Sequence, residues 1–278
     1  MVPGGEPPHF GEGELSESLT ETSPTGQAAD TRNRLTPLDL RLALVSGWAD
    51  FRAAPLFGLF FASIFVVGGL ALTYFLVDQG EYTWAIPAVA GFPLIAPFTA
   101  VGLYEVSRRR ELGLPLSWPA ILGAVRGRGD EQILSMGVII FVAFGFWVIV
   151  AHVIFSIAMV EAGTGSESLA FFFSSTGLIM LGVGSVVGGI MALVFYAVTL
   201  FSLPMLIDRE VDFLTAIIAS LAAFRANFAL LLGWAFVIAV LLFVAMLPAF
   251  LGLFVVLPVL GHATWHLYKQ AQPSTFVG

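Results

Sequence analysis

The chain has 278 residues, of which 58% are hydrophobic and only 11% are charged, and its mean hydropathy is +0.92. A soluble domain of this length does not need so much apolar surface, so the composition excludes that class and indicates an integral membrane protein. The net charge is −7, and no basic face exists outside the membrane flank, which argues against nucleic-acid binding. The absence of cysteine excludes thiol catalysis, disulfides and cysteine-ligated metals.

The two ends of the chain predict tails outside the membrane. Residues 1–35 are rich in Pro, Gly, Ser, Thr and Glu and contain no apolar segment, so they are not a signal peptide. Such a composition buries too little surface to offset the entropy of ordering. We therefore predict a disordered cytoplasmic tail over 1–35 and a short cytoplasmic tail over 271–278.

An amphipathic helix is predicted directly after the first tail. Thr36 can cap it, Pro37 suits its first position, and Asp39 lies near the positive end of the helix dipole. Small and acidic residues form one stripe and apolar residues form another: Asp39, Ala43, Ser46 and Asp50 against Leu38, Leu42, Val45 and Trp48. A helix with this pattern lies in the membrane surface rather than across the bilayer.

Long apolar stretches predict an all-α membrane domain over residues 36–270. A span needs about 20 apolar residues. Six stretches qualify: Pro55–Val77, Thr83–Tyr104, Ile133–Val160, Thr176–Leu203, Asn227–Leu247 and Ala249–Tyr268. The last two are separated at Pro248, because one continuous helix would be about 64 Å long, twice the hydrocarbon core.

An internal repeat organises these spans. Ser46–Phe61 and Ala219–Trp234 match at a shift of 173 residues, including Phe-Arg-Ala in both, and a weaker copy runs from Trp118 to Arg128. We predict three units, over 36–110, 115–209 and 211–269, each consisting of an interfacial helix followed by a hairpin of two spans.

The basic residues predict the orientation of the chain. All twelve fall on one side of the six spans: Arg32, Arg34, Arg41, Arg52, Arg108, Arg109, Arg110, Arg126, Arg128, Arg209, Arg225 and Lys269. The opposite loops carry acidic residues only. The positive-inside rule then places both termini in the cytoplasm of a bacterial inner membrane.

Three histidines are candidates for cofactor binding. His152 lies inside the third span, where an ionisable group suggests a haem or quinone contact or, alternatively, a neutral ring bonded to a carbonyl. His262 and His266 share a helix face near the opposite side of the membrane, and a metal there would need a further ligand such as Glu105, with Asp208 behind it. Interfacial aromatic anchoring is the alternative for this pair. We expect no cofactor, with haem or metal left open.

Other residues suit lipid contact or packing. Arg52 and Arg225, where each interfacial helix meets a span, suit lipid phosphates, pairing with Glu105, Asp208 or Glu210, or plain anchoring. Arg108, Arg109 and Lys269 are further anchoring candidates. Gly184 and Gly188 have the spacing that lets helices pack closely.

Four segments carry a family resemblance. Asp39–Phe51, Gly102–Arg109, Pro204–Arg209 and Pro258–Tyr268 mix polar and aromatic residues at fixed places. Together they make residues 36–270 similar to the family called domain of unknown function 2189. The resemblance implies an integral membrane protein of proteobacteria, and some members carry the label of a cytochrome c oxidase subunit, which points to respiratory membranes rather than to an activity.

The sequence therefore predicts a protein without catalysis. No Asp, Glu, Lys or Arg lies mid-membrane, and no phosphate loop or dinucleotide motif is present, which disfavours coupled transporters and enzymes. We expect an accessory, assembly or lipid-organising factor, in contact with membrane lipids and associated with respiratory-chain complexes. The alternatives are an uncoupled transporter or channel for a small solute or lipid, and a haem- or metal-binding redox protein.

Overall fold

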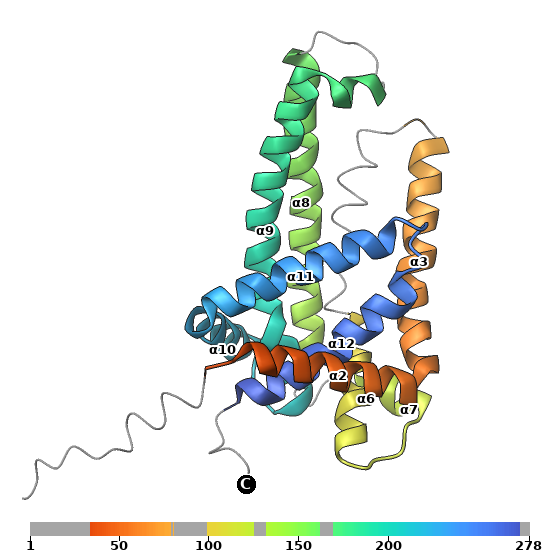
Figure 1. The fold of residues 1–278 in the computed structure, drawn as a ribbon, viewed down its shortest axis with the longest axis vertical. Coiled ribbons are helices and arrows are strands. Elements are labelled where there is room, and N and C mark those ends of the chain that lie inside the picture. The colour runs from red at the N-terminus through yellow and green to blue at the C-terminus, as the bar shows by residue number, and fades with distance from the viewer. Residues whose placement is uncertain (1–33, 79, 81–98, 125–131, 162–168, 273–278) are drawn as a thin grey trace, which may run out of the picture.

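A computed structural model describes residues 34–78, 80, 99–124, 132–161 and 169–272 (Figure 1). All the regular elements in these ranges are helices, which confirms the predicted fold class. In chain order they are α2 (Pro37–Ala53), α3 (Pro55–Asp78), α6 (Val101–Glu111), α7 (Trp118–Gly123), α8 (Gln132–Glu161), the 3₁₀ helix η3 (Leu169–Phe173), α9 (Ser175–Asp208), α10 (Phe213–Ala226), α11 (Phe228–Met246) and α12 (Leu253–Ala271).

Four of these helices are long and apolar enough to cross a membrane, namely α3, α8, α9 and α11. They correspond to the first, third, fourth and fifth predicted spans. Most of the second predicted span, like most of the two predicted tails, lies outside the described residues. The sixth predicted span becomes α12, which is not among the four candidates, because its C-terminal half carries polar side chains that pack inside the protein.

Figure 1 shows α3, α8 and α9 upright, whereas α11 lies obliquely across them and the shorter helices lie across one end. α8 and α9 run antiparallel, while α2 crosses near their lower end. The predicted start of α2 is confirmed: Thr36 N–H donates to Asp39 Oδ2 at 2.7 Å, and Asp39 N–H donates to Thr36 Oγ1 at 3.4 Å. This reciprocal capping box satisfies backbone donors that the helix cannot pair internally.

Helix α2 packs with its small stripe against α12. Ala43 is 1% exposed and Gly47 is buried. A Cβ atom at Gly47 would lie 2.6 Å from the backbone nitrogen of Ala263 and 2.7 Å from the carbonyl oxygen of Val259. The apolar stripe faces outward instead, with Val45 59% and Trp48 44% exposed. This apolar-outward arrangement is the one that a helix in the membrane surface requires.

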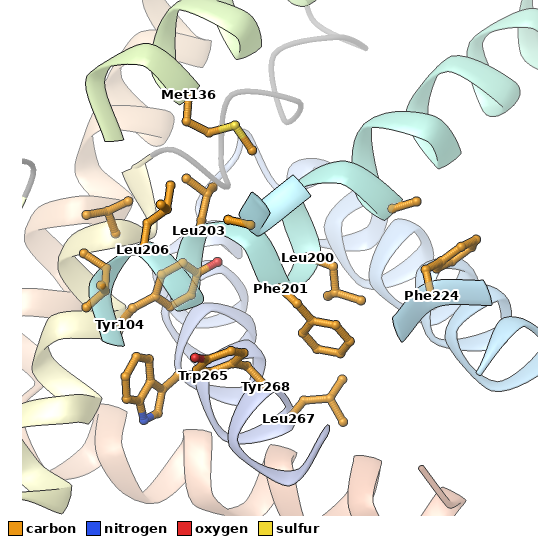
Figure 2. Close-up of a cluster of buried hydrophobic side chains, with 14 of the residues drawn as sticks. Tyr104, Met136, Leu200, Phe201, Leu203, Leu206, Phe224, Trp265, Leu267 and Tyr268 are labelled. Carbon is orange, nitrogen blue, oxygen red and sulfur yellow. The ribbon is translucent and has the colours of Figure 1, made fainter. Parts of the chain in front are cut away.

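The largest core lies where α9 and α12 meet α6 and the start of α8 (Figure 2). Trp265 and Tyr268 of α12 are buried against this cluster, at 0% and 1% exposure. The shared apolar side chains include Tyr104, Met136, Phe201, Leu203 and Leu206. Because α12 joins this core on one side and α2 on the other, it positions the residues described next.

The contact at Gly47 predicts a large effect of a single methyl group. Gly47→Ala should lower the free energy of unfolding by about 1–3 kcal/mol, since backbone atoms of α12 cannot move aside as a side chain would. Gly184→Ala is the control, because nothing lies within 4 Å of a Cβ there and alanine favours the helix. Denaturant titration in detergent checks both, and equal effects would contradict the close contact.

Candidate functional site

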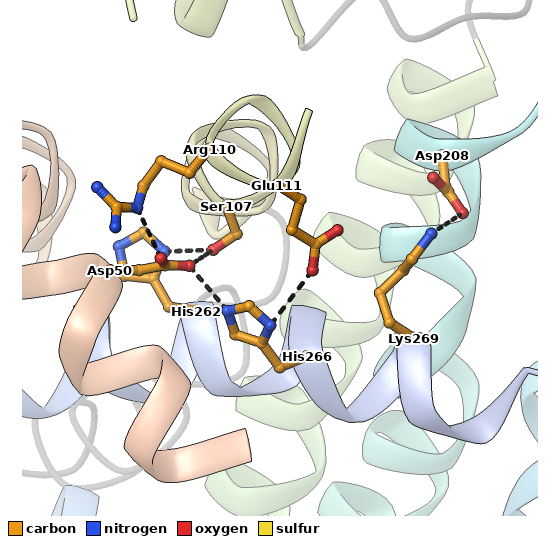
Figure 3. Close-up of polar contacts among 8 residues, drawn as sticks. All are labelled: Asp50, Ser107, Arg110, Glu111, Asp208, His262, His266 and Lys269. Carbon is orange, nitrogen blue, oxygen red and sulfur yellow. Dashed lines mark hydrogen bonds and ion pairs between the residues drawn. The ribbon is translucent and has the colours of Figure 1, made fainter. Parts of the chain in front are cut away.

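Six polar residues from three helices meet between α2, α6 and α12 (Figure 3). We call this group the polar junction; it consists of Asp50, Ser107, Arg110, Glu111, His262 and His266. Asp50 comes from the last turn of α2, the next three residues from the C-terminal half of α6, and the histidines from one face of α12. The junction exists because the small stripe of α2 lets the three helices approach closely.

The Asp50 carboxylate is the centre of the junction. Its Oδ2 accepts hydrogen bonds from Ser107 Oγ at 2.6 Å and from His266 Nε2 at 2.8 Å, and its Oδ1 accepts from Arg110 Nε at 2.7 Å. Burial by itself would raise the pKa of Asp50, but the bonds from His266, Ser107 and Arg110 outweigh it and lower the pKa to about 2. Asp50 is therefore ionised at neutral pH.

His266 lies between two carboxylates. Its Nε2 contacts Asp50, and its Nδ1 lies 3.3 Å from Glu111 Oε1. Burial would lower the pKa of His266, but the hydrogen bonds to Asp50 and Glu111 raise it to about 9. The ring is thus an imidazolium at neutral pH and donates from both nitrogens.

His262 is buried completely and, unlike His266, is uncharged at neutral pH. Its Nδ1 lies 2.8 Å from Ser107 Oγ. The single hydroxyl proton of Ser107 is donated to Asp50, so His262 Nδ1 carries a hydrogen and donates it to Ser107. Burial lowers the pKa of His262 to about 4, so the ring is neutral. Its Nε2 has no hydrogen-bond partner among the described residues.

The order of these hydrogen bonds determines what the junction can do chemically. A serine nucleophile needs a histidine nitrogen that accepts its proton. Here Ser107 stands between Asp50 and His262, gives its proton to the carboxylate and accepts from the ring. This arrangement does not activate Ser107, but it does tie three helices together through buried, charge-assisted bonds.

Glu105 does not join His262 and His266 in the metal site that the sequence analysis considered for these three residues. Its carboxylate accepts from Arg108 Nε at 2.7 Å and from Arg109 Nε at 2.6 Å. In the described part of the chain, no group of three or more His, Asp or Glu side chains is arranged to hold a metal ion. The structure does bring His262 and His266 to one site, but with Asp50 and Glu111 beside them.

The other candidate residues lie outside the junction. His152 is on α8, half-buried, and its backbone carbonyl accepts from Ser156 Oγ at 2.9 Å. Lys269 lies 3.4 Å from Asp208, which also accepts from Tyr268 Oη at 3.0 Å. Asp208 therefore belongs to a second polar group at the end of α12, rather than to a metal site with the histidines.

The two packing glycines differ. A Cβ at Gly188 would clash with the ring of Trp147 on α8, so this glycine lies in a tight helix contact as predicted. Gly184 has nothing within 4 Å, which corrects its assignment to the same contact. The two positions lie on the same side of α9, about one turn apart, but among the described residues only Gly188 meets a side chain of α8.

Four residues of the junction were not predicted as site residues: Asp50, Ser107, Arg110 and Glu111. One signal for Asp50 was present in the sequence, because an acidic residue on a small-residue stripe, opposite an apolar stripe, must be buried against polar partners. The partners themselves lie 57 to 216 positions away in the chain, and nothing local identifies them.

Comparison with known proteins gives one match. Residues 85–208 match the model of a family described as predicted integral membrane protein (DUF2189). This confirms the family resemblance over that range, which includes the segment Gly102–Arg109 and most of Pro204–Arg209. No curated protein and no solved structure matches the chain.

The opposite pKa shifts of the two histidines predict a maximum of stability near neutral pH. His266 is stabilising below its ordinary pKa of 6.5, and this contribution is lost as pH rises through about 9. His262, whose pKa is lowered, is stabilising above 6.5, and its contribution is lost as pH falls through about 4. Thermal midpoints in detergent, measured from pH 4 to 10, should fall on both sides of a maximum near neutral pH. The variant His266→Gln should reduce the fall on the alkaline side of this maximum only.

Removing the Ser107 hydroxyl should destabilise the junction. Ser107→Ala leaves the His262 Nδ1–H without an acceptor and takes one donor from Asp50, at about 1–3 kcal/mol for each buried group left unpaired. Ser63→Ala is the matched control, since its hydroxyl bonds only to the Phe60 carbonyl on the exposed side of α3, and we expect less than about 0.5 kcal/mol. Denaturant unfolding measures both, and a neutral Ser107→Ala would contradict the hydrogen-bond order.

Proposed function

Because residues 85–208 match a family of predicted integral membrane proteins, we propose that the chain is a bacterial inner-membrane protein that acts without catalysis. Its role in this proposal is that of an accessory, assembly or lipid-organising factor, working beside respiratory-chain complexes. The protein is embedded in the membrane by several apolar helices, and its function lies in the surfaces that those helices offer to neighbours.

The exposed apolar surface of α8 and α9 carries this proposal. In the most apolar 18-residue segment of each helix, only 11% is buried within the protein, against 33% in the corresponding segment of α3. Phe141 and Val142 on α8 are 72% and 63% exposed, and Val186 on α9 is 63% exposed. Apolar faces of this extent are available for packing against helices of another membrane protein or against lipid.

The polar junction supports a structural role in place of a catalytic one. Asp50, Ser107 and His262 are almost completely buried, and their hydrogen bonds connect α2, α6 and α12. Polar groups that are satisfied by one another in this way rigidify the layer of short helices. In our proposal this layer is the platform from which the α8–α9 pair extends.

Burial supports the proposed repeat of units. α2 and α10 each precede an apolar helix, and positions 173 residues apart have the same environment. Buried pairs are Ala43 with Ala216, Gly47 with Ser220 and Phe51 with Phe224, and exposed pairs are Val45 with Ile218, Ala49 with Ala222 and Arg52 with Arg225. The proposal therefore keeps three units. It counts α12, the second helix of the last unit, as a shorter and more polar helix whose C-terminal half, with His262 and His266, lies outside the membrane-spanning segments.

The orientation of the protein in the membrane is proposed from the position of the layer of short helices. α2, α6, α10 and the C-terminal end of α12 lie toward one end of the long helices (Figure 1). The described basic residues belong to these elements or their flanks, and the positive-inside rule assigns that end to the cytoplasm.

Photo-crosslinking tests the proposed role. A photoreactive phenylalanine analogue at Phe141 or Val186, in protein expressed at its native level, should yield adducts with other membrane proteins that mass spectrometry identifies. The same analogue at Ile140, which is 2% exposed, is the control and should crosslink only within the chain. If the two exposed positions yield lipid adducts alone, the accessory and assembly roles are wrong.

A further inference from the structure

Arg52 and Arg225 are both exposed, and neither makes a hydrogen bond or ion pair within the described residues. Each occupies the last turn of its helix, α2 or α10. Each directly follows a buried phenylalanine, Phe51 at 9% exposure and Phe224 at 7%, which fixes the direction of the helix end. By contrast, the three consecutive arginines that end α6, at positions 108 to 110, are all paired with carboxylates.

Each arginine ends an exposed apolar stripe. On α10, Leu214 and Ile218 are 57% and 59% exposed and lie on the side that leads to Arg225. On α2, the exposed side chains of Val45 and Trp48 lead to the arginine at position 52 in the same way. An apolar helix face with arginine at its margin is the pattern of a helix seated at the boundary of acyl chains and headgroups.

We propose that Arg52 and Arg225 form two equivalent binding sites for the phosphate groups of anionic phospholipids. This inference rests on the membrane location in the proposed function. The apolar stripe sets the depth of each helix in the leaflet, and the guanidinium at its end then lies at the level of the headgroups. Its planar fork donates two parallel hydrogen bonds to the non-bridging oxygens of a phosphodiester.

The carboxylates on these two helices are either already paired or far from the arginines. The polar junction already binds Asp50, the acidic residue nearest to Arg52. The other acidic residue of each helix lies at the opposite end, 13 positions from the arginine or about 20 Å along the axis: Asp39 in α2 and Asp212 beside α10. Both carboxylates are already used in helix capping, through Thr36 and Thr215. These two capping carboxylates therefore do not compete with a phosphate for either arginine.

Lipid titration of the full-length protein tests this proposal. The protein in a neutral detergent is titrated with phosphatidylglycerol, with phosphatidylcholine or with inorganic phosphate, and native mass spectrometry measures the bound fraction. Arg52→Gln and Arg225→Gln should each weaken phosphatidylglycerol binding at one site about fivefold, and the double variant should weaken it at both. Arg52→Lys should fall between, because it keeps the charge and loses the fork.

Matched variants distinguish phosphate binding at these arginines from a general loss of positive charge or of folding. Lys269→Gln should change phosphatidylglycerol binding little, since Lys269 already faces Asp208. Thermal midpoints of the arginine variants should match that of the unmodified protein, because both side chains are exposed and neither has a partner in the part of the chain that the structure describes.

Two outcomes overturn the proposal: unchanged phosphatidylglycerol binding in the double variant, or equal affinity for phosphatidylcholine. Equal affinity for inorganic phosphate overturns it in favour of a free-anion site. The crosslinks from α8 and α9 do not depend on these arginines, so the lipid sites and the proposed accessory role can fail separately.

Discussion

A single buried carboxylate, that of Asp50, holds together three helices that are far apart in the sequence. It accepts hydrogen bonds from Ser107 and Arg110 of α6 and from His266 of α12, while it belongs to α2. In a lipid environment an unpaired carboxylate would be very costly, so the helices must bring it partners. The positions of α2, α6 and α12, and through α12 the main core, depend on meeting this requirement.

The same requirement explains why the short helices turn their apolar sides outward. The small stripe of α2 provides the close approach at Gly47 that places Asp50 beside the histidines. Its apolar stripe is then left for lipid, with Val45 as exposed as Ile218 on α10. Polar groups inside and apolar groups outside invert the pattern of a soluble protein, and in our proposal the exposed arginines at the helix ends are where this layer meets charged headgroups.

The structure assigns very different roles to residues that look alike in the sequence. His262 and His266 are one helical turn apart, yet one is neutral and the other is an imidazolium, because one packs into the interior and the other stands between two carboxylates. Arg109 and Arg225 both end helices, yet among the described residues only Arg109 of these two is paired with a carboxylate. Glu105 was a candidate metal ligand with the histidines, but its carboxylate is paired with Arg108 and Arg109 of its own helix α6.

The sequence alone determined that this is a membrane protein. Mean hydropathy depends only on composition, and span length and amphipathic stripes depend only on the order of residues along one helix. The sequence also predicted the start of α2 and four of the apolar helices, and it separated the small and apolar stripes of α2. Only the tertiary structure decided that α12 is a packed, partly polar helix, and that Asp50 is the centre of the polar junction. Those facts depend on contacts between residues up to 216 positions apart, and no local pattern encodes which distant side chains will supply a buried charge with its hydrogen bonds.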